Sequence, residues 1–533
     1  MSSDSTAPAS GRLVDGDHAT MSIAAILAES AHRTPDRPAL HFMGHTIPYG
    51  ALWDQTRAYA GALRDRGIGQ GDRVAVIIPN VPDFVRVYYA VLSLGAVVVP
   101  VHLLFKADEI EYVLRDSGAK LAVVAAPVLG EAAVAAVRAG VALTTVLLPE
   151  DIAAEKGIAR LEGEADAAEP IARYASTHPM DAATVLYTSG TTGTPKGAVG
   201  SHLNMIEQVN VALLDTFPMT ADDVVFGGLP LFHIFGQMAV LNVAFRRGAS
   251  IILLPKFDPA EALELMVRYG ATTFTAVPTM YIGMLQAAEA TDARPPLRYA
   301  VSGGAALPVA VLERFQELYG APIHEGYGLT ETSPTVSFNY VGRTPRPGTV
   351  GQPNWGVDVE IADAENDDQI VLLPHGELGE IVVRGYNLFA GYLGRPDATE
   401  ATFTDGWFRT GDLGTKTDDD YITIVDRKKD MIVRNGYNVY PNEVEQVMLR
   451  HPGVVNAAVF GVADEVHGQE IHAAVIPHGA DVDTDELIAY VRDRIAAYKY
   501  PRVVHLVDDL PLGPSGKVLK RELVARFQPA PTA

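Results

Sequence analysis

The hydrophobic and polar positions of this chain follow two periods, and together they predict a layered α/β protein. Short runs such as RVAVIIP (73–79), GAVVVPV (95–101) and KLAVVAA (120–126) are almost continuously apolar, which is typical of strands buried on both faces of a parallel sheet. Segments 107–118 and 260–270 repeat apolar residues at helical spacing and end at glycine, a common helix terminator. Strands and amphipathic helices are therefore expected to alternate, with parallel sheets.

The pattern changes along the chain and divides it into parts. Between about residues 340 and 425, short strands are separated by Gly, Pro and Asp, which predicts a mostly antiparallel β unit. Residues 427–533 hold 13 basic and 14 acidic side chains, whereas the preceding part carries a net charge of −22. The fold class predicted is α/β plus α+β. We expect a disordered tail at 1–20, a large N-terminal domain at 21–426 with two α/β subdomains and a distorted β unit, and a small mobile α+β domain at 427–533.

Composition narrows the function classes. The 533 residues carry a net charge of −23 at pH 7, which argues against a nucleic-acid-binding protein, because such a protein needs a clustered basic face. The absence of cysteine excludes disulfides, thiolate zinc sites, iron–sulfur clusters and cysteine nucleophiles. It also leaves the redox compartment open, so a cytoplasmic location is the default expectation. The uncharged stretch 88–105 is long enough for a membrane span, but Gly95 and Pro100 interrupt it, and we predict a buried helix followed by a buried strand.

The segment LYTSGTTGTPKGAV (186–199) combines hydroxyl side chains and glycines with Lys196. Glycines let backbone N–H groups converge on an anion, hydroxyls donate further hydrogen bonds, and a lysine neutralises phosphate charge. The segment differs from a Walker A loop, because Pro195 stands where that motif needs glycine. Ser189 does not fit a nucleophile elbow, because Tyr187 takes the place of its first glycine. The segment therefore predicts another kind of phosphate-binding loop.

This loop resembles the signature of the adenylate-forming, acyl-activating superfamily, which includes acyl-CoA synthetases, aryl-CoA ligases, adenylation domains and beetle luciferases. Further motifs follow in the order of that superfamily over about residues 30–525. They are VSGGAALP (301–308), EGYGLTETSP (325–334), WFRTGDLG (407–414), DRKKDMIVRNGYNVYPNEVE (426–445) and LGPSGKVLKREL (512–523). The resemblance implies ATP and Mg²⁺ as cofactors and coenzyme A as co-substrate.

The resemblance also assigns roles to single residues. Thr330 would contact phosphate and Glu331 would bind Mg²⁺, which proteins usually hold with one or two carboxylates and phosphate oxygens. Lys517 would be the catalytic lysine that bridges the attacking carboxylate and the α-phosphate. Lys429 would be the hinge about which the small domain swings. The nucleotide-binding residues implied are Thr188, Ser189, Gly190, Thr191, Thr192, Gly193, Lys196, Gly304, Ala305, Gly326, Tyr327 beside adenine, Gly328, Asp412 and Arg427 on the ribose, Lys429 and Gly436.

The acid substrate is expected next to His233, which matches the aromatic gate of the superfamily and is counted among the catalytic residues. Amino-acid-activating relatives usually place an aspartate there to hold the substrate ammonium group. The predicted pocket residues carry no charge: they are Phe232, Val277, Gly303, Pro334 and Val336. An apolar or aromatic acid is therefore favoured over an amino acid.

The expected reaction is activation of a small-molecule carboxylic acid to acyl-AMP, followed by transfer to CoA. A medium- or long-chain fatty acyl-CoA synthetase is the first choice. An aryl (cinnamate-like) CoA ligase, an acyl-AMP ligase that loads a carrier protein and a non-catalytic nucleotide sensor remain alternatives. Retention of Glu331, Asp412, Arg427 and Lys517 together argues against the sensor. Peripheral membrane contact for a lipid substrate and the oligomeric state stay open.

Overall fold

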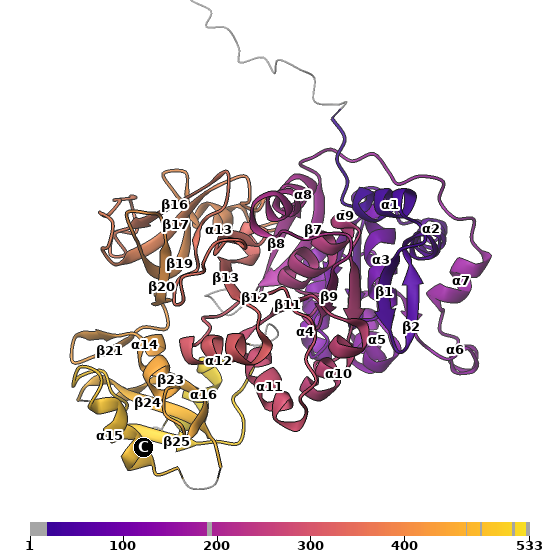
Figure 1. The fold of residues 1–533 in the computed structure, drawn as a ribbon. Coiled ribbons are helices and arrows are strands. Elements are labelled where there is room, and N and C mark those ends of the chain that lie inside the picture. Colours follow the sequence, from indigo (N-terminus) through magenta and orange to yellow (C-terminus); the bar gives the residue numbers. More distant parts are fainter. Residues whose placement is uncertain (1–18, 189–194, 465, 480–481, 514–516, 529–533) are drawn as a thin grey trace, which may run out of the picture.

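The computed structural model describes residues 19–188, 195–464, 466–479, 482–513 and 517–528. Within these ranges the strands form four sheets, three of which end by Arg427 and one of which begins at Ile432 (Figure 1). The predicted fold class is confirmed. Residues 1–18 of the predicted tail lie outside the described residues, and so do five of the predicted nucleotide-binding residues: Ser189, Gly190, Thr191, Thr192 and Gly193.

The first sheet is parallel except at one edge, where β7 and β8 pair antiparallel and carry the two ends of the phosphate loop. Its inner strands are almost wholly buried, which explains their continuous apolar sequences. All three strands predicted from these sequences are confirmed. In spatial order the strands are β6 (Ala142–Val146), β5 (Leu121–Ala125), β3 (Arg73–Ile77), β4 (Val97–Pro100), β7 (Ala182–Thr188) and β8 (Lys196–Ser201).

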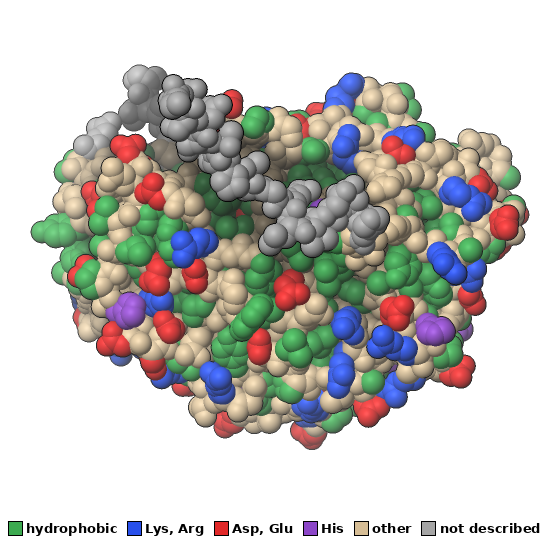
Figure 2. Space-filling model, turned by 90° about the horizontal axis from the view of Figure 1, so that it is seen from above, with side chains coloured by type: hydrophobic (Ala, Val, Ile, Leu, Met, Phe, Trp, Pro, Cys, Tyr) green, Lys and Arg blue, Asp and Glu red, His purple; other side chains and the backbone are tan. Residues whose placement is uncertain are grey.

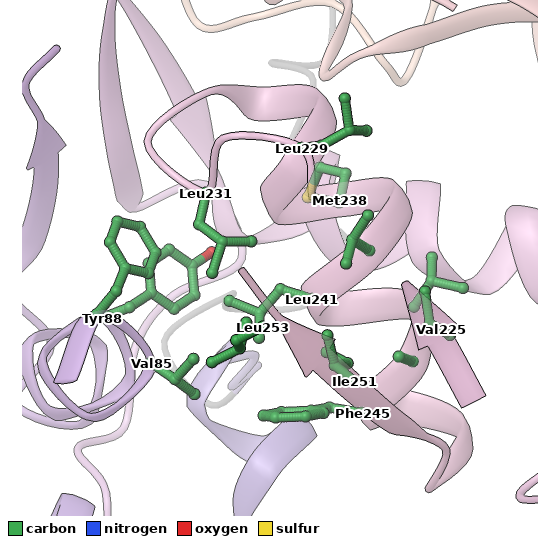
Figure 3. Packing of buried hydrophobic residues seen from close by; sticks show 14 of the residues in the cluster. Val85, Tyr88, Val225, Leu229, Leu231, Met238, Leu241, Phe245, Ile251 and Leu253 are labelled. Carbon is green, nitrogen blue, oxygen red and sulfur yellow. The ribbon is translucent and has the colours of Figure 1, made fainter. Parts of the chain in front are cut away.

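The second sheet is parallel in its centre and antiparallel at both edges. In spatial order its strands are β15 (Gln352–Pro353), β14 (Thr335–Phe338), β13 (Ile323–Gly328), β12 (Tyr299–Ser302), β11 (Thr273–Ala276), β9 (Val224–Gly227), β10 (Ser250–Leu253), β1 (Pro38–Phe42) and β2 (His45–Pro48). Figure 3 shows how one main core joins this sheet to a neighbouring helix: Tyr88 points toward Leu231 and Val85 toward Leu253, and all four are buried.

Helices cover these two sheets and connect their strands (Figure 1). The predicted helices near 107–118 and 260–270 are confirmed, and each ends at a glycine with positive φ, Gly118 and Gly270. The helices are α1 (Ala24–Arg33), α2 (Tyr49–Asp65), α3 (Pro82–Ser93), α4 (Ala107–Ser117), α5 (Leu129–Ala139), α6 (Glu150–Lys156), α7 (Leu161–Ala167), α8 (His202–Val211), α9 (Val243–Arg247), α10 (Pro259–Tyr269), α11 (Pro278–Ala287) and α12 (Val309–Tyr319), with π-helical turns η3 (Ala212–Thr216) and η4 (Gly236–Asn242).

The uncharged stretch 88–105 runs from α3 into β4, and both elements are buried inside the first part of the chain, as predicted. None of the helices in the described residues is long and apolar enough to span a membrane.

The third sheet is antiparallel, in agreement with the texture of its sequence. It consists of β16 (Val357–Ala362), β17 (Gly379–Gly385), β18 (Phe403–Thr404), β19 (Trp407–Lys416) and β20 (Ile422–Arg427), with α13 (Pro396–Glu400) beside it. The fourth sheet consists of β21 (Ile432–Arg434), β22 (Tyr437–Val439), β23 (Val454–Asp464), β24 (Gly468–Pro477) and β25 (Val503–Leu506), covered by α14 (Pro441–Met448), α15 (Thr484–Arg492) and α16 (Lys520–Phe527).

The chain passes from the third sheet to the fourth between Arg427 and Ile432. Beside this connection, the buried carboxylate of Asp426 accepts hydrogen bonds from the backbone N–H of Asn442 in α14 (2.9 Å) and of Arg427 (2.8 Å). This contact ties the end of β20 to the first helix of the C-terminal part.

On the face of the molecule drawn in Figure 2, acidic and basic side chains are interspersed.

Candidate active site

A cleft of about 1170 Å³ is lined by residues from the first three sheets, by the segments between them and by parts of the C-terminal region outside the fourth sheet. It brings together most of the predicted site residues that the structure describes, although they span more than 300 positions of the chain. These are Thr188, Lys196, Phe232, His233, Gly303, Gly304, Gly326, Tyr327, Gly328, Thr330, Glu331, Pro334, Asp412, Arg427, Lys429 and Lys517. Their roles stay predictions, but their proximity is a property of the fold.

Four predicted residues lie elsewhere. Val277 belongs to the main core, and Val336 is fully buried in the core beside the third sheet, so neither lines the cleft in this structure. Ala305 is exposed next to the glycine turn. Gly436 is exposed in the connection between β21 and β22, where its φ of +78° suits glycine.

One end of the cleft carries a buried carboxylate, that of Asp412. Its Oδ2 accepts a hydrogen bond from the Tyr327 hydroxyl (2.6 Å), and its Oδ1 lies 3.3 Å from Nε of Arg427. Pairing of β19 with β20 places Asp412 directly opposite Arg427. Burial, reinforced by the charge of Asp412, raises the pKa of Tyr327, so its hydroxyl remains a donor. Asp412 keeps unused lone pairs that can accept hydrogen bonds from a diol.

Glu331 lies beside the two stems of the predicted phosphate loop, which are the end of β7 at Thr188 and the start of β8 at Lys196. Its Oε1 accepts hydrogen bonds from the Tyr392 hydroxyl (2.9 Å) and more weakly from the Thr188 hydroxyl (3.4 Å). Nζ of Lys196 stands over the Tyr392 ring, 5.1 Å from its centroid. Tyr392 was missed by the sequence analysis, because a lone tyrosine in the turn GYLGRP gives no local sign that it will meet a carboxylate 61 positions away.

The oxygen-bearing side chains around Glu331 fit a Mg²⁺ ion that binds together with a triphosphate. Mg²⁺ is usually held by one or two carboxylates together with substrate phosphate oxygens and waters. Glu331 supplies one carboxylate, and Thr188 and Thr330 line the same wall with hydroxyl groups. Phosphate oxygens and waters would complete the coordination.

His233 faces the middle of the cleft as a neutral ring. Burial, with the nearby positive charge of Lys517, lowers its pKa to about 4. Its Nδ1 accepts the backbone N–H of Phe235 (3.2 Å), which leaves the proton on Nε2. His233 can therefore donate one hydrogen bond from Nε2 without adding charge.

Lys517 is one of the residues that the C-terminal part contributes to the cleft. Its carbonyl accepts the backbone N–H of Gly513 (2.6 Å), which fixes the backbone of Lys517. Burial and the positive charge of Arg427 lower the pKa of Lys517 to about 8, although Asp412 and Glu331 act in the opposite direction. A lysine in this environment is placed to contact the negative charge that we expect the substrates to bring into the cleft.

The cleft section between His233 and the second sheet is uncharged. Its lining comes from α8, η3, η4, β12, β14 and adjoining segments, and most of these residues were not predicted from the sequence. They are Gln208, Val209, Ala212, Thr216, Phe217, Phe235, Met238, Ala239, Val243, Val301, Ser302, Thr335 and Phe338. Two of these elements are π-helical turns, which are rare and frequently occur at functional sites. The apolar residues of these segments cannot be distinguished from core residues by sequence alone.

The chain also matches family models and known proteins over most of its length. The AMP-binding enzyme model matches residues 27–393, and the AMP-binding enzyme C-terminal domain model matches residues 443–517. A long-chain-fatty-acid–CoA ligase of Bacillus subtilis (strain 168) is 34% identical over 528 residues, covering 94% of this chain and 93% of that protein. A feruloyl-CoA synthase of an Amycolatopsis species is 35% identical over 507 residues, covering 93% and 97%.

Among solved structures, ATP-bound MatB from Rhodopseudomonas palustris superimposes with a TM-score of 0.86 at 32% identity, covering 96% of this chain and 99% of that one. The superfamily predicted from the ordered motifs is confirmed. With one family model spanning most of the N-terminal part and a second reaching Lys517, this chain belongs to the AMP-binding enzyme family.

Proposed function

We propose that this protein is an AMP-forming acid–CoA ligase whose acid substrate is a medium- or long-chain fatty acid. The observation that carries the proposal is the position of Lys517, which lines the same cleft as Glu331, Asp412 and His233. The cleft thus offers a carboxylate for metal, a carboxylate for a ribose diol and a lysine for developing negative charge, next to an uncharged section for an acid.

In the first half-reaction a carboxylate oxygen of the acid attacks the α-phosphorus of ATP. The bond from that phosphorus to the bridging oxygen breaks, and acyl-AMP and pyrophosphate form. Protonated Lys517 would stabilise the charge that builds on the α-phosphate and the attacking carboxylate. Bound Mg²⁺, held by Glu331, would neutralise the triphosphate oxygens. Positioning and electrostatics would supply the catalysis.

In the second half-reaction the sulfur of CoA, having lost its proton, attacks the acyl carbonyl carbon, and AMP leaves. Lys517 lines the cleft in the present arrangement. In this proposal its side chain withdraws before the thiol enters. We propose that the domain of residues 427–533 rotates relative to residues 21–426 about Lys429. This residue lies in the connection between the third and fourth sheets, where few backbone changes can reorient the whole domain.

The uncharged section of the cleft supports an apolar monocarboxylic acid. Each buried CH₂ group of a substrate chain would contribute about 0.8 kcal/mol. A second carboxylate in this section would need a cationic partner, because an unpaired buried charge is strongly unfavourable. The described residues that line this section include no Lys or Arg.

An aryl acid is the second candidate. Phe217, Phe235 and Phe338 line the uncharged section, and such rings stack well against an aromatic substrate. The similarity to a feruloyl-CoA synthase points the same way. Transfer to a carrier protein in place of CoA, and membrane contact during uptake of a lipid acid, remain further proposals.

A pyrophosphate-exchange screen tests the function. Fatty acids of graded length, cinnamate-type acids, dicarboxylic acids and amino acids are each supplied with ATP and Mg²⁺, and CoA consumption is then measured with the active acids. The proposal expects exchange and thioester formation with fatty acids. Preference for cinnamate-type acids would select the aryl candidate. Exchange without thioester until a carrier protein is added would select the carrier, and ATP binding without exchange would indicate a nucleotide sensor.

A further inference from the structure

Helix α4 presents two polar residues at a spacing that places them on one face. Tyr112 and Asp116 are four positions apart and are therefore neighbours on the helix surface. Asp116 is the next-to-last residue of α4, where the negative end of the helix dipole disfavours a carboxylate. Its side chain is only 16% exposed. A largely desolvated acid at this end of a helix needs compensation from outside the helix.

That compensation comes from residues on both sides of the phosphate loop. Oδ2 of Asp116 accepts the hydroxyl of Tyr187 (2.8 Å), and Oδ1 accepts Nη2 of Arg395 (2.6 Å). The same Nη2 donates to the hydroxyl of Tyr112 (3.0 Å), which in turn donates to the carbonyl of Pro195 (2.7 Å). Every donor in this set has its own acceptor, so all the hydrogen bonds can form together.

The contacts converge on the loop stems. Tyr187 directly precedes Thr188 at the end of β7, and Pro195 directly precedes Lys196 at the start of β8. The rings of Tyr112 and Tyr187 also meet edge to face, with centroids 6.2 Å apart. One carboxylate thus connects both stems through hydrogen bonds that do not belong to the β7–β8 pairing.

Arg395 extends this set of hydrogen bonds to the part of the cleft that holds Glu331. Its backbone N–H donates to the carbonyl of Tyr392 (3.1 Å), and the Tyr392 hydroxyl donates to Glu331 (2.9 Å). The neighbouring Leu393 donates its N–H to the carbonyl of Gly197 in β8 (2.8 Å). The segment that holds Glu331 is therefore connected to the same carboxylate as the loop stems.

The geometry points to Asp116 as a positioning residue for the triphosphate of ATP. Tyr112 and Tyr187 line the cleft, and Asp116 acts through them and through Arg395. It holds the two loop stems at a set separation and orients the Tyr392–Glu331 pair, so that groups contacting the β- and γ-phosphates are in place before ATP binds. This inference goes beyond the proposed function but rests on its use of ATP.

Asp116→Ala and Asp116→Asn test the role. We expect Asp116→Ala to raise KM for ATP and for pyrophosphate about tenfold to a hundredfold, the range for losing hydrogen bonds to a charged group. KM for the acid and the rate of thioester formation from supplied acyl-AMP should stay within about twofold, because acyl-AMP has no β- or γ-phosphate. Asp116→Asn keeps one acceptor oxygen and should lie between Asp116→Ala and the unmodified protein.

Tyr187→Phe and Tyr112→Phe test the two stems one at a time, because each removes a single hydroxyl group that contacts or belongs to one stem. Each should raise KM for ATP less than Asp116→Ala does. Adding Tyr187→Phe to Asp116→Ala should cause no further loss, because the shared contact is already gone. A matched control is Asp223→Ala, since Asp223 is also buried and pairs with a partly exposed arginine, Arg298, at 2.6 Å, but does not line the cleft. It should lower Tm and leave KM for ATP unchanged.

Two results would overturn the inference. One is an unchanged KM for ATP in folded Asp116→Ala, with Tm checked by calorimetry. The other is an equal loss in thioester formation from acyl-AMP, which would indicate general misfolding. If the unmodified protein showed no exchange with any acid, the proposed function would fail. The role of Asp116 would then be decided by the rise of Tm with ATP concentration, expected to need at least about tenfold more ATP in Asp116→Ala.

Discussion

Tyr327 and Asp412 meet through a hydrogen bond of 2.6 Å between the phenolic hydroxyl and Oδ2, although 85 positions separate them in the chain. The bond crosses from β13 of the second sheet to β19 of the third. It fixes the orientation of the carboxylate that we expect to bind the ribose of ATP. The second and third sheets therefore build this end of the cleft jointly.

Tyr327→Phe removes this hydrogen bond and keeps the ring. We expect KM for ATP to rise about tenfold, because the Asp412 carboxylate loses a charged hydrogen bond and some of its orientation. The effect should be smaller for 2′-deoxy-ATP, which lacks one of the hydroxyls that Asp412 would accept. Initial rates of pyrophosphate exchange with both nucleotides check this. An equal rise for the two nucleotides would contradict a ribose role for Asp412.

Lys517→Ala should lower the rate of acyl-AMP formation about 10²-fold or more, the range for losing a preorganised electrostatic contact. Thioester formation from supplied acyl-AMP should suffer far less, because the lysine serves only the first half-reaction. Single-turnover measurements of the two steps distinguish these outcomes. Equal loss in both steps would refute the assigned role.

The pH profile should show the unusual pKa of Lys517. Its protonated form is the active one, and burial lowers its pKa to about 8. The kcat/KM for ATP in the exchange reaction should therefore fall as pH rises through about 8, whereas an ordinary lysine would stay charged to about pH 10. Lys517→Arg, which keeps its charge at high pH, should move the fall upward. An identical falling limb in Lys517→Arg would assign it to another group.

Lys429→Pro tests the hinge. Proline fixes φ near −65°, so the connection between the third and fourth sheets should no longer exchange freely between conformations. We expect acyl-AMP formation close to normal and thioester formation severely reduced. Lys429→Ala removes the side chain but leaves the backbone free, and should retain both steps. Two intact half-reactions in Lys429→Pro would place the rotation elsewhere.

Gly303 lies at the wall of the proposed acid pocket. A Cβ atom there would come within 3.0 Å of the Phe235 ring, so Gly303→Leu should push the ring into the uncharged section and discriminate against large acids. We expect kcat/KM to fall in proportion to acid size for Gly303→Leu, with KM for ATP nearly unchanged. Assays over straight-chain and cinnamate-type acids measure this.

Two further variants separate bulk from backbone strain. Gly303→Ala adds little volume, and the neighbouring Gly304 has a φ of +84°, so Gly304→Ala introduces strain at almost the same place. A size-dependent loss confined to Gly303→Leu supports the pocket wall. A uniform loss across all acids in the three variants would mean strain, and an unchanged ranking of acids would move the substrate chain elsewhere.

The local structure and the family follow from the amino-acid sequence alone. The apolar runs that became β3, β4 and β5, and the helical periods that became α4 and α10, depend on burial of consecutive residues and on 3.6-residue spacing. The ordered motifs identified the superfamily, because loops that bind phosphate and metal need particular residues at short, fixed separations. These properties depend on neighbours in the chain, so they are readable without coordinates.

Which side chains meet in the site depends on the three-dimensional fold. Tyr392 reaches Glu331 across 61 positions and Arg395 reaches Asp116 across 279, and no local period encodes such pairs. The fold also buries Val336 in the core beside the third sheet and not in the predicted pocket. The reason is that the face which a strand residue presents to a cleft depends on how neighbouring sheets pack. The low pKa of Lys517 has the same origin, because its burial and the nearness of Arg427 exist only once the C-terminal domain rests against the cleft.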